Sequence, residues 1–218
     1  MMALTPQQPS GSTAEIGTGM EQFHHPRPVC TGRGPASRPT PEREHLLAGL
    51  AGRVVEIGAG DGVKLTCYPP DVTDIVLVEP DPFLRSTAAQ IADSIPASVQ
   101  IIDGTTTRIP VADGSCDAVV CALVLCCAPL KQTLAEIRRV LRPGGQLRFY
   151  EHVRSANPIL ALAETLVTPI WARASGGCHP ACDPVAAIHE AGFILEDVEH
   201  RTVQHVSHVV GIALTPSP

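Results

Sequence analysis

The feature that most constrains the fold is a glycine-rich turn that follows a short apolar strand. The strand is expected over residues 53–57 (Arg-Val-Val-Glu-Ile), and the turn reads Gly58-Ala-Gly-Asp-Gly62. Glycines in such a turn let the backbone bend tightly and let a ligand approach it closely. The sequence therefore predicts a ligand site where the first strand of a sheet ends.

Strand and helix signals alternate along the rest of the chain. Strands are expected over 53–57, 74–78, 99–102, 116–123, 146–150, 193–198 and 205–214, and helices over 42–50, 81–95, 130–141, 158–171 and 184–191. Continuous apolar runs such as 116–123 suit strands that are buried on both faces of a parallel sheet. The alternation predicts an α/β domain with a mainly parallel sheet.

The first 40 residues differ from the rest, because they are rich in proline, poor in aliphatic residues and without a periodic pattern. We expect residues 1–40 to form a disordered or loosely attached tail. Residues 41–218 are then one domain, since 218 residues with 44% hydrophobic content can bury a single core.

Composition excludes several classes of function. A net charge of -6 offers no broad basic surface for nucleic acid. No apolar run approaches the roughly 20 residues of a membrane helix, so no integral membrane segment is expected. The N-terminus lacks a signal-peptide pattern and the eight cysteines do not look like a disulfide framework, which favours a cytoplasmic location. The excess of Arg over Lys, with abundant Ala, Gly and Pro, suggests a GC-rich bacterial source.

Two groups of residues resemble partial metal sites. They are Cys178-His179-x-x-Cys182, and the loose set His200, His205 and His208. Neither group has a paired Cys-x-x-Cys partner of the kind that structural zinc sites use. The sequence therefore predicts no metal.

Acidic residues around the turn indicate which ligand it holds. Glu79 ends the second expected strand, 19 positions after Gly60, where a carboxylate can accept hydrogen bonds from both hydroxyls of a ribose. Glu56 and Asp61 would repel a pyrophosphate, and the third glycine comes one position earlier than in dinucleotide sites. They favour the cationic amino and sulfonium groups of S-adenosylmethionine, which is the expected cofactor.

At these residues the sequence resembles the class I S-adenosylmethionine-dependent methyltransferases of the methyltransferase type 11-like group. Residues 109–120 and 138–145 also match the family's segments before its fourth and fifth strands. The resemblance implies a single Rossmann-like doubly wound, seven-stranded sheet of order 3-2-1-4-5-7-6 with an antiparallel last strand. It also implies that Asp103 and Gly104 meet the adenine. The expected cofactor residues are Glu56, Gly58, Ala59, Gly60, Gly62, Glu79, Pro80, Asp103, Gly104, Ala122 and Leu123.

A narrower resemblance is to the methyltransferase-like group that includes the mammalian alkyl-thiol S-methyltransferases and their bacterial relatives. It rests on residues 67–70 (Cys-Tyr-Pro-Pro), 123–126 (Leu-Val-Leu-Cys), 149–153 (Phe-Tyr-Glu-His-Val) and 176–179 (Gly-Gly-Cys-His). The chain departs from this group before its first strand, where residues 25–35 are a poor helix and no N-terminal membrane anchor is visible. The resemblance implies methyl transfer to a small, apolar thiol by a monomer or homodimer.

Catalytic candidates follow the fifth expected strand, at the carboxyl edge where open α/β sheets bind ligands. His152 is the first candidate for a base or an acceptor-orienting group, with Glu151 beside it and His179 as a second histidine; the alternative is that His152 only shapes the turn. The expected acceptor pocket comprises Leu125, Cys126, Trp171 and Cys178. Two other functions stay open. One is C- or O-methylation of a quinone, lipid or polyketide-like acceptor, and the other is cofactor binding without catalysis.

Overall fold

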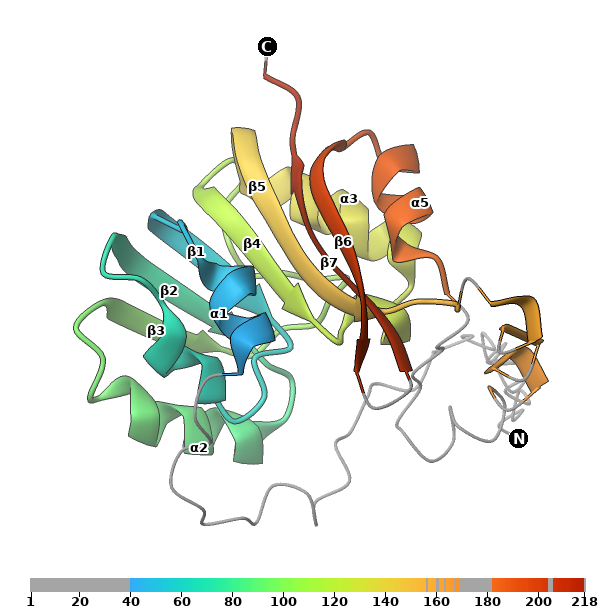
Figure 1. Cartoon of the computed structure of the whole chain (residues 1–218). Coiled ribbons are helices and arrows are strands. Elements are labelled where there is room, and N and C mark those ends of the chain that lie inside the picture. Colours follow the sequence, from blue (N-terminus) through green and yellow to red (C-terminus); the bar gives the residue numbers. More distant parts are fainter. Residues whose placement is uncertain are drawn as a thin grey trace, which may run out of the picture.

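A computed structural model describes residues 40–155, 157–159, 161–162, 164–166, 168, 182–203 and 206–217. Seven strands form one sheet in the order β3-β2-β1-β4-β5-β7-β6 (Figure 1). Strands β1 to β5 pair in parallel, and β7 pairs antiparallel with both β5 and β6. The predicted α/β class, strand order and antiparallel last strand are confirmed. The expected tail, except Thr40 at its boundary, lies outside the described residues, as do Trp171, Cys178, His179 and His205.

The strands agree with the sequence pattern in number and order. They span β1 Gly52–Ile57, β2 Val72–Val78, β3 Ser98–Ile102, β4 Cys116–Ala122, β5 Leu141–His152, β6 Ile194–Val203 and β7 Val206–Leu214. Strand β5 begins earlier than expected, because the chain continues straight from the preceding helix through Arg142-Pro-Gly-Gly145 in an irregular part of the ladder. Strand β6 continues beyond the expected Val198, since its whole length pairs with β7.

The helices begin at residues that can cap them. They are α1 Pro41–Leu47, α2 Pro82–Ala92, α3 Leu130–Val140 and α5 Pro184–Glu190, with short 3-10 turns η2 Val63–Cys67 and η3 Leu125–Cys127. Asp81 accepts the N–H of Phe83 at 2.8 Å, and Asp183 accepts the N–H of Ala186 at 2.9 Å. Each cap precedes a proline in the first turn, where a missing N–H costs nothing. None of the helices in the described part of the chain could span a membrane.

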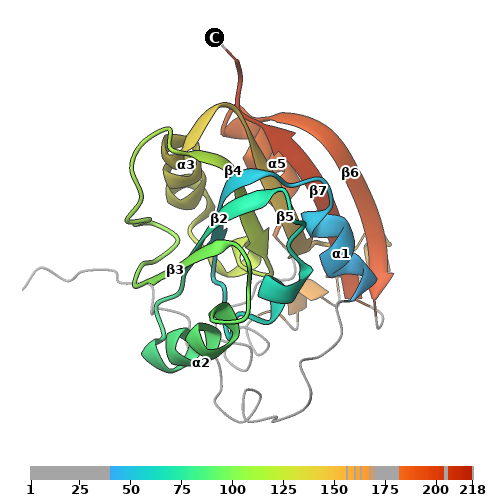
Figure 2. The ribbon, with the colours of Figure 1, turned by 90° about the vertical axis from the view of Figure 1, so that its left-hand side faces the viewer.

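The sheet is buried on both faces, as the apolar strands predict. Alternate residues of β1 point to opposite sides: Val55 packs in a cluster with Leu134 and Ile137 of α3, and Val54 packs in a cluster with Leu46 of α1. Figure 2 shows α1 and α3 with the sheet between them. This packing fixes where the carboxyl ends of β1 to β4 meet.

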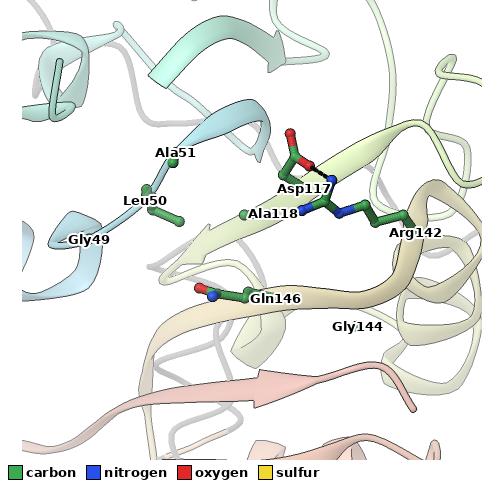
Figure 3. Close-up of a pocket in the computed structure, with 8 residues that line it drawn as sticks. All are labelled: Gly49, Leu50, Ala51, Asp117, Ala118, Arg142, Gly144 and Gln146. Atoms are coloured by element: carbon green, nitrogen blue, oxygen red, sulfur yellow. Dashed lines mark ion pairs between the residues drawn. The ribbon is translucent and has the colours of Figure 1, made fainter. Parts of the chain in front are cut away.

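A second small hollow lies at the opposite end of the strands. It is lined by residues before β1, including Gly49, and by Asp117, Arg142 and Gln146 near the beginning of β4 and β5 (Figure 3). An ion pair of 2.5 Å between Arg142 Nη1 and Asp117 Oδ1 crosses it. This hollow is therefore distinct from the carboxyl ends, where the sequence predicts the ligand.

Candidate functional site

The glycine turn at the end of β1 is built from three glycines in the left-handed region. Gly58, Gly60 and Gly62 have φ values of 63°, 62° and 78°. A Cβ on Gly58 would lie 2.6 Å from Val124 Cγ2, and one on Gly62 would lie 2.8 Å from Ala88 Cβ. A Cβ on Gly60 would meet nothing within 4 Å. Two of the glycines thus serve packing, while Gly60 leaves open space beside the turn that a ligand can occupy.

Glu79 is fixed beside this turn. Its side chain accepts the N–H of Gly60 at 2.9 Å on Oε2 and the N–H of Asp81 at 3.0 Å on Oε1, and the residue is 6% exposed. A buried carboxylate with two backbone donors is held in one orientation. The end of β2 and the turn after β1 are therefore a single rigid unit, and each carboxylate oxygen retains acceptor capacity for a hydroxyl group.

Arg85 of α2 is a site residue that the sequence reasoning missed. Its Nη1 lies 2.7 Å from the carbonyl oxygen of Glu79, 2.8 Å from that of Pro80 and 3.3 Å from Asp103 Oδ1. The guanidinium thus joins the ends of β2 and β3. Its position six residues after Glu79, on the first turn and a half of a helix, was the available signal.

Asp103 and Gly104 occupy different environments after β3. Asp103 is exposed, so its carboxylate is open to a ligand. Gly104 is buried, and a Cβ there would lie 2.7 Å from Val78 Cγ1 and 2.8 Å from Pro110 Cδ. Gly104 is therefore required by packing, and its glycine identity needs no ligand to explain it.

Glu56 differs from its expected place as a partner of a cationic ligand. It is 1% exposed, its Oε1 lies 2.8 Å from Lys64 Nζ, and its Oε2 accepts the hydroxyl of Tyr68 at 2.7 Å. Burial, followed by the charge of Glu56, raises the pKa of Tyr68 well above its usual value, so this residue remains a hydroxyl donor. Glu56 is already neutralised by Lys64 beneath the turn, and it supports the turn rather than facing open space.

The segment after β4 is held by Glu151, which is also placed differently from the catalytic role expected for it. The Glu151 carboxylate accepts the N–H of Val124 at 3.0 Å and the N–H of Cys126 at 3.2 Å, and the residue is 0% exposed. Burial raises its pKa to about 7 against the lowering effect of these backbone donors. Glu151 is thus sealed from any acceptor and acts as an anchor for this segment.

His152 follows Glu151 and is only partly buried. Its Nδ1 lies 3.7 Å from Cys126 Sγ, and its ring packs at 4.6 Å against His208, which in turn stacks on Tyr150 at 5.1 Å. Cys182 donates to the His152 carbonyl oxygen at 3.5 Å. An imidazole among thiols and rings is chemically able to exchange a proton with an acceptor at this edge.

The remaining predicted site residues divide between open and packed positions. Pro80 and Ala122 are half-buried and Leu123 is exposed, all at the carboxyl edge. Ala59, Leu125 and Cys126 are buried, so they line the site from within. His179, Trp171 and Cys178 lie outside the described residues, and the structure does not place them with the others.

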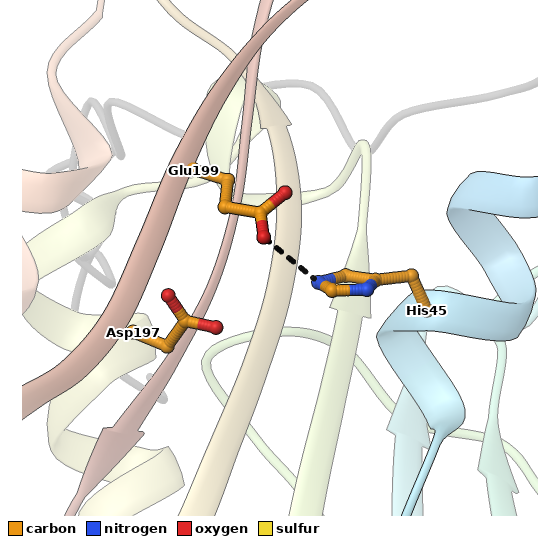
Figure 4. A group of neighbouring side chains, drawn as sticks. All are labelled: His45, Asp197 and Glu199. Carbon is orange, nitrogen blue, oxygen red and sulfur yellow. Dashed lines mark ion pairs between the residues drawn. The ribbon is translucent and has the colours of Figure 1, made fainter.

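One group of side chains in the described part of the chain has ligand atoms close enough to hold a cation. Figure 4 shows His45 of α1 facing Asp197 and Glu199 of β6, with His45 Nε2 at 3.9 Å from Glu199 Oε1. Glu199 also pairs with Arg201 Nη2 at 2.7 Å, which supplies its positive charge. This group lies on the edge strand and contains none of the predicted cofactor or catalytic residues.

Comparisons with known proteins agree with this geometry. A methyltransferase domain model matches residues 55–149. Human thiol S-methyltransferase TMT1B is 37% identical over 142 residues, which cover 61% of this chain and 57% of that protein, so the chain spans less than two thirds of this relative. The ubiquinone/menaquinone biosynthesis C-methyltransferase UbiE of Syntrophotalea carbinolica is 27% identical over 176 residues, which cover 76% of this chain and 74% of that enzyme.

Solved structures support the same fold. The structure of a geranyl diphosphate methyltransferase in complex with S-adenosylmethionine superimposes with a TM-score of 0.64 at 14% identity, over 78% of this chain and 82% of that one. At this identity the likeness concerns the fold, whose strand order and glycine turn are those described above. The chain belongs to the class I S-adenosylmethionine-dependent methyltransferases.

Proposed function

We propose that this protein transfers a methyl group from S-adenosylmethionine to a small apolar acceptor, and that the acceptor atom is a thiol sulfur. The observation that carries the proposal is the rigid pair of Glu79 and Gly60, joined at 2.9 Å beside open space. A carboxylate fixed next to an approachable backbone suits a ribose whose adjacent atoms lie along the turn.

The cofactor site has a defined polarity in this proposal. Glu79 binds the ribose hydroxyls, Asp103 meets the adenine amino group, and the backbone at Gly60 lies against the sulfonium end. Arg85 keeps the two carboxylate-bearing segments together, since it donates to the backbone after Glu79 and pairs with Asp103. Lys64 neutralises Glu56, so the turn carries less negative charge than its sequence suggests.

Catalysis in this proposal depends mainly on positioning. S-adenosylmethionine supplies an electrophilic methyl group bound to a sulfonium. The protein must align an acceptor lone pair with the bond that breaks, which can supply much of the acceleration. For a thiol the reactive form is the thiolate, whose ordinary pKa is about 8.5, so only modest help with proton removal is needed. We assign this help to His152, which takes the acceptor proton on its ring.

Two observations support a thiol acceptor. The relative TMT1B is named for thiol S-methylation, and the side chain that meets the carboxyl edge beside Glu151 is an imidazole rather than a strong base. The second candidate, C-methylation of a quinone-like ring, is favoured by the likeness to UbiE, which covers more of the chain at lower identity. Both acceptors are apolar, and they differ in the atom that is methylated.

A titration and a turnover assay test the proposal together. Calorimetry should show binding of S-adenosylmethionine and S-adenosylhomocysteine in the micromolar range and no binding of NAD. Turnover is then measured on small thiols, phenols and quinols, with His152→Ala as the variant and exposed His189→Ala of α5 as its matched control. His152→Ala should lower kcat more than cofactor affinity. Adenosyl binding without turnover on any acceptor would instead indicate a cofactor-binding protein that does not catalyse.

A further inference from the structure

Leu123 has a backbone conformation that leucine rarely adopts. Its φ is 58°, and it is the one non-glycine residue with positive φ in the described part of the chain. For a branched side chain this region is sterically unfavourable, because Cβ crowds the following carbonyl group. Such a residue persists only where the surrounding structure holds it, and it occurs most often at functional sites.

Contacts on both sides of Leu123 hold this conformation. Its own N–H donates to the carbonyl oxygen of Tyr150 at 2.7 Å. The next residue, Val124, donates its N–H to the buried carboxylate of Glu151 at 3.0 Å, and its side chain occupies the space that a Cβ on Gly58 would need. The segment after β4 is thus fixed between the glycine turn and the end of β5.

Burial of the leucine side chain does not compensate the strain. Leu123 is 42% exposed, whereas Leu125, two residues later, is 1% exposed. A leucine that the core does not need, in a conformation that glycine would adopt without strain, calls for another explanation. Its place supplies one: it follows β4 directly, and the carbonyl that anchors it belongs to Tyr150, two residues before His152.

We propose that Leu123 is a specificity-determining residue that presents an apolar surface to the acceptor beside His152. This inference rests on the proposed function, since it assigns one wall of the same site. The strained backbone fixes the direction of the side chain, so an alkyl acceptor meets a preformed surface and loses little conformational freedom. A polar acceptor gains nothing from this wall.

The test compares two variants that remove the same side chain. Leu123→Ala removes the apolar wall and keeps the strained backbone, whereas Leu123→Gly removes the wall and relieves the strain. Ile194→Ala is the matched control, because Ile194 is a 55% exposed aliphatic residue at the start of edge strand β6. We would measure thermal unfolding, calorimetric binding of S-adenosylhomocysteine, and kcat and KM for 1-hexanethiol and 2-mercaptoethanol.

Both Leu123 variants should lose roughly 10- to 100-fold in kcat/KM for 1-hexanethiol, mainly through KM, as expected for loss of one aliphatic contact surface. Activity on 2-mercaptoethanol and affinity for S-adenosylhomocysteine should change less than about twofold. Leu123→Gly should unfold about 2–4 °C above Leu123→Ala, because only glycine relieves the strain. Ile194→Ala should match the parent protein in both thiol assays.

An unchanged ratio between the two thiols would overturn the assignment. A parallel loss of S-adenosylhomocysteine affinity would instead place Leu123 in the cofactor site. Calorimetric binding of 1-hexanethiol to the protein loaded with S-adenosylhomocysteine makes the test independent of turnover. If the parent protein binds this thiol but methylates no acceptor, the proposed function fails while the role of Leu123 can still be read from the variants. Equal affinity of parent and variants would reject that role.

Discussion

Lys64 and Glu56 form a buried ion pair directly beneath the glycine turn. The two side chains are 9% and 1% exposed, and Lys64 Nζ lies 2.8 Å from Glu56 Oε1 in a direction unsuited to a well-aligned hydrogen bond. The second carboxylate oxygen accepts the hydroxyl of Tyr68 at 2.7 Å. A buried charge of this kind is tolerated only while its partner is present. The pair therefore couples the stability of η2 to that of β1, which carries the turn.

Lys64→Met should destabilise the protein strongly. The substitution keeps much of the side-chain volume and leaves Glu56 as an uncompensated buried charge, which costs about 3–5 kcal/mol. Guanidinium unfolding would measure the loss. Lys131→Met is the natural control, because Lys131 is the other lysine of the chain and is exposed on α3. If Lys64→Met and Lys131→Met unfold at the same denaturant concentration, the buried pair contributes nothing to stability.

Glu79→Ala should weaken S-adenosylmethionine binding by roughly 10- to 100-fold, the range expected for loss of one hydrogen-bonded charged acceptor. The variant also leaves the N–H groups of Gly60 and Asp81 without their carboxylate partner. Calorimetry measures the affinity, and Glu190→Ala at the exposed end of α5 serves as the control. Unchanged affinity in Glu79→Ala would mean that the ribose lies elsewhere.

Local sequence patterns predicted the elements that need only neighbours along the chain. The strand order followed from apolar runs and the family resemblance, and the helix starts followed from Asp81 and Asp183, each of which caps the helix after it. The turn was recognisable because Gly58 and Gly60 follow a strand directly. These features depend on period, capping and backbone freedom, which a sequence displays.

Contacts between distant segments were not predictable in the same way. Glu151 bonds to Val124, 27 positions earlier, only because β4 and β5 lie side by side in register. Arg139 is typical of a solvated helix face, yet it donates to the carbonyl oxygens of Ile109 and Val111. A long side chain can choose among many partners, and the sheet must be assembled before the choice is fixed. The same holds for Leu123, whose strain arises from anchors on two other strands.

Arg85→Ala should lower cofactor affinity more than stability. The guanidinium bridges the backbone after Glu79 to Asp103, and loss of these contacts loosens both ligand-bearing segments, by about 1–2 kcal/mol or roughly 5- to 30-fold in affinity. Arg85→Lys is the informative companion, because an ammonium keeps the charge but cannot reproduce the planar fork. Calorimetry on both variants should give the order wild type, Lys, Ala. Equal affinity in all three would show that α2 does not shape the adenosine site.

The stability of the protein should fall as the pH rises through the titration of Glu151. Burial raises the pKa of this carboxyl group from 4.5 to about 7, so between these values the folded protein holds a proton that the unfolded chain has released. Its stabilising contribution is complete below pH 4.5 and is lost as the pH rises through about 7, a change on the order of 1–3 kcal/mol. Guanidinium unfolding at pH 5, 6, 7 and 8 would follow it. Glu151→Gln cannot titrate, so the difference in unfolding free energy between wild type and this variant isolates the carboxyl group from all others. That difference should shrink from pH 5 to pH 8, and a constant difference would mean that Glu151 titrates with an ordinary pKa.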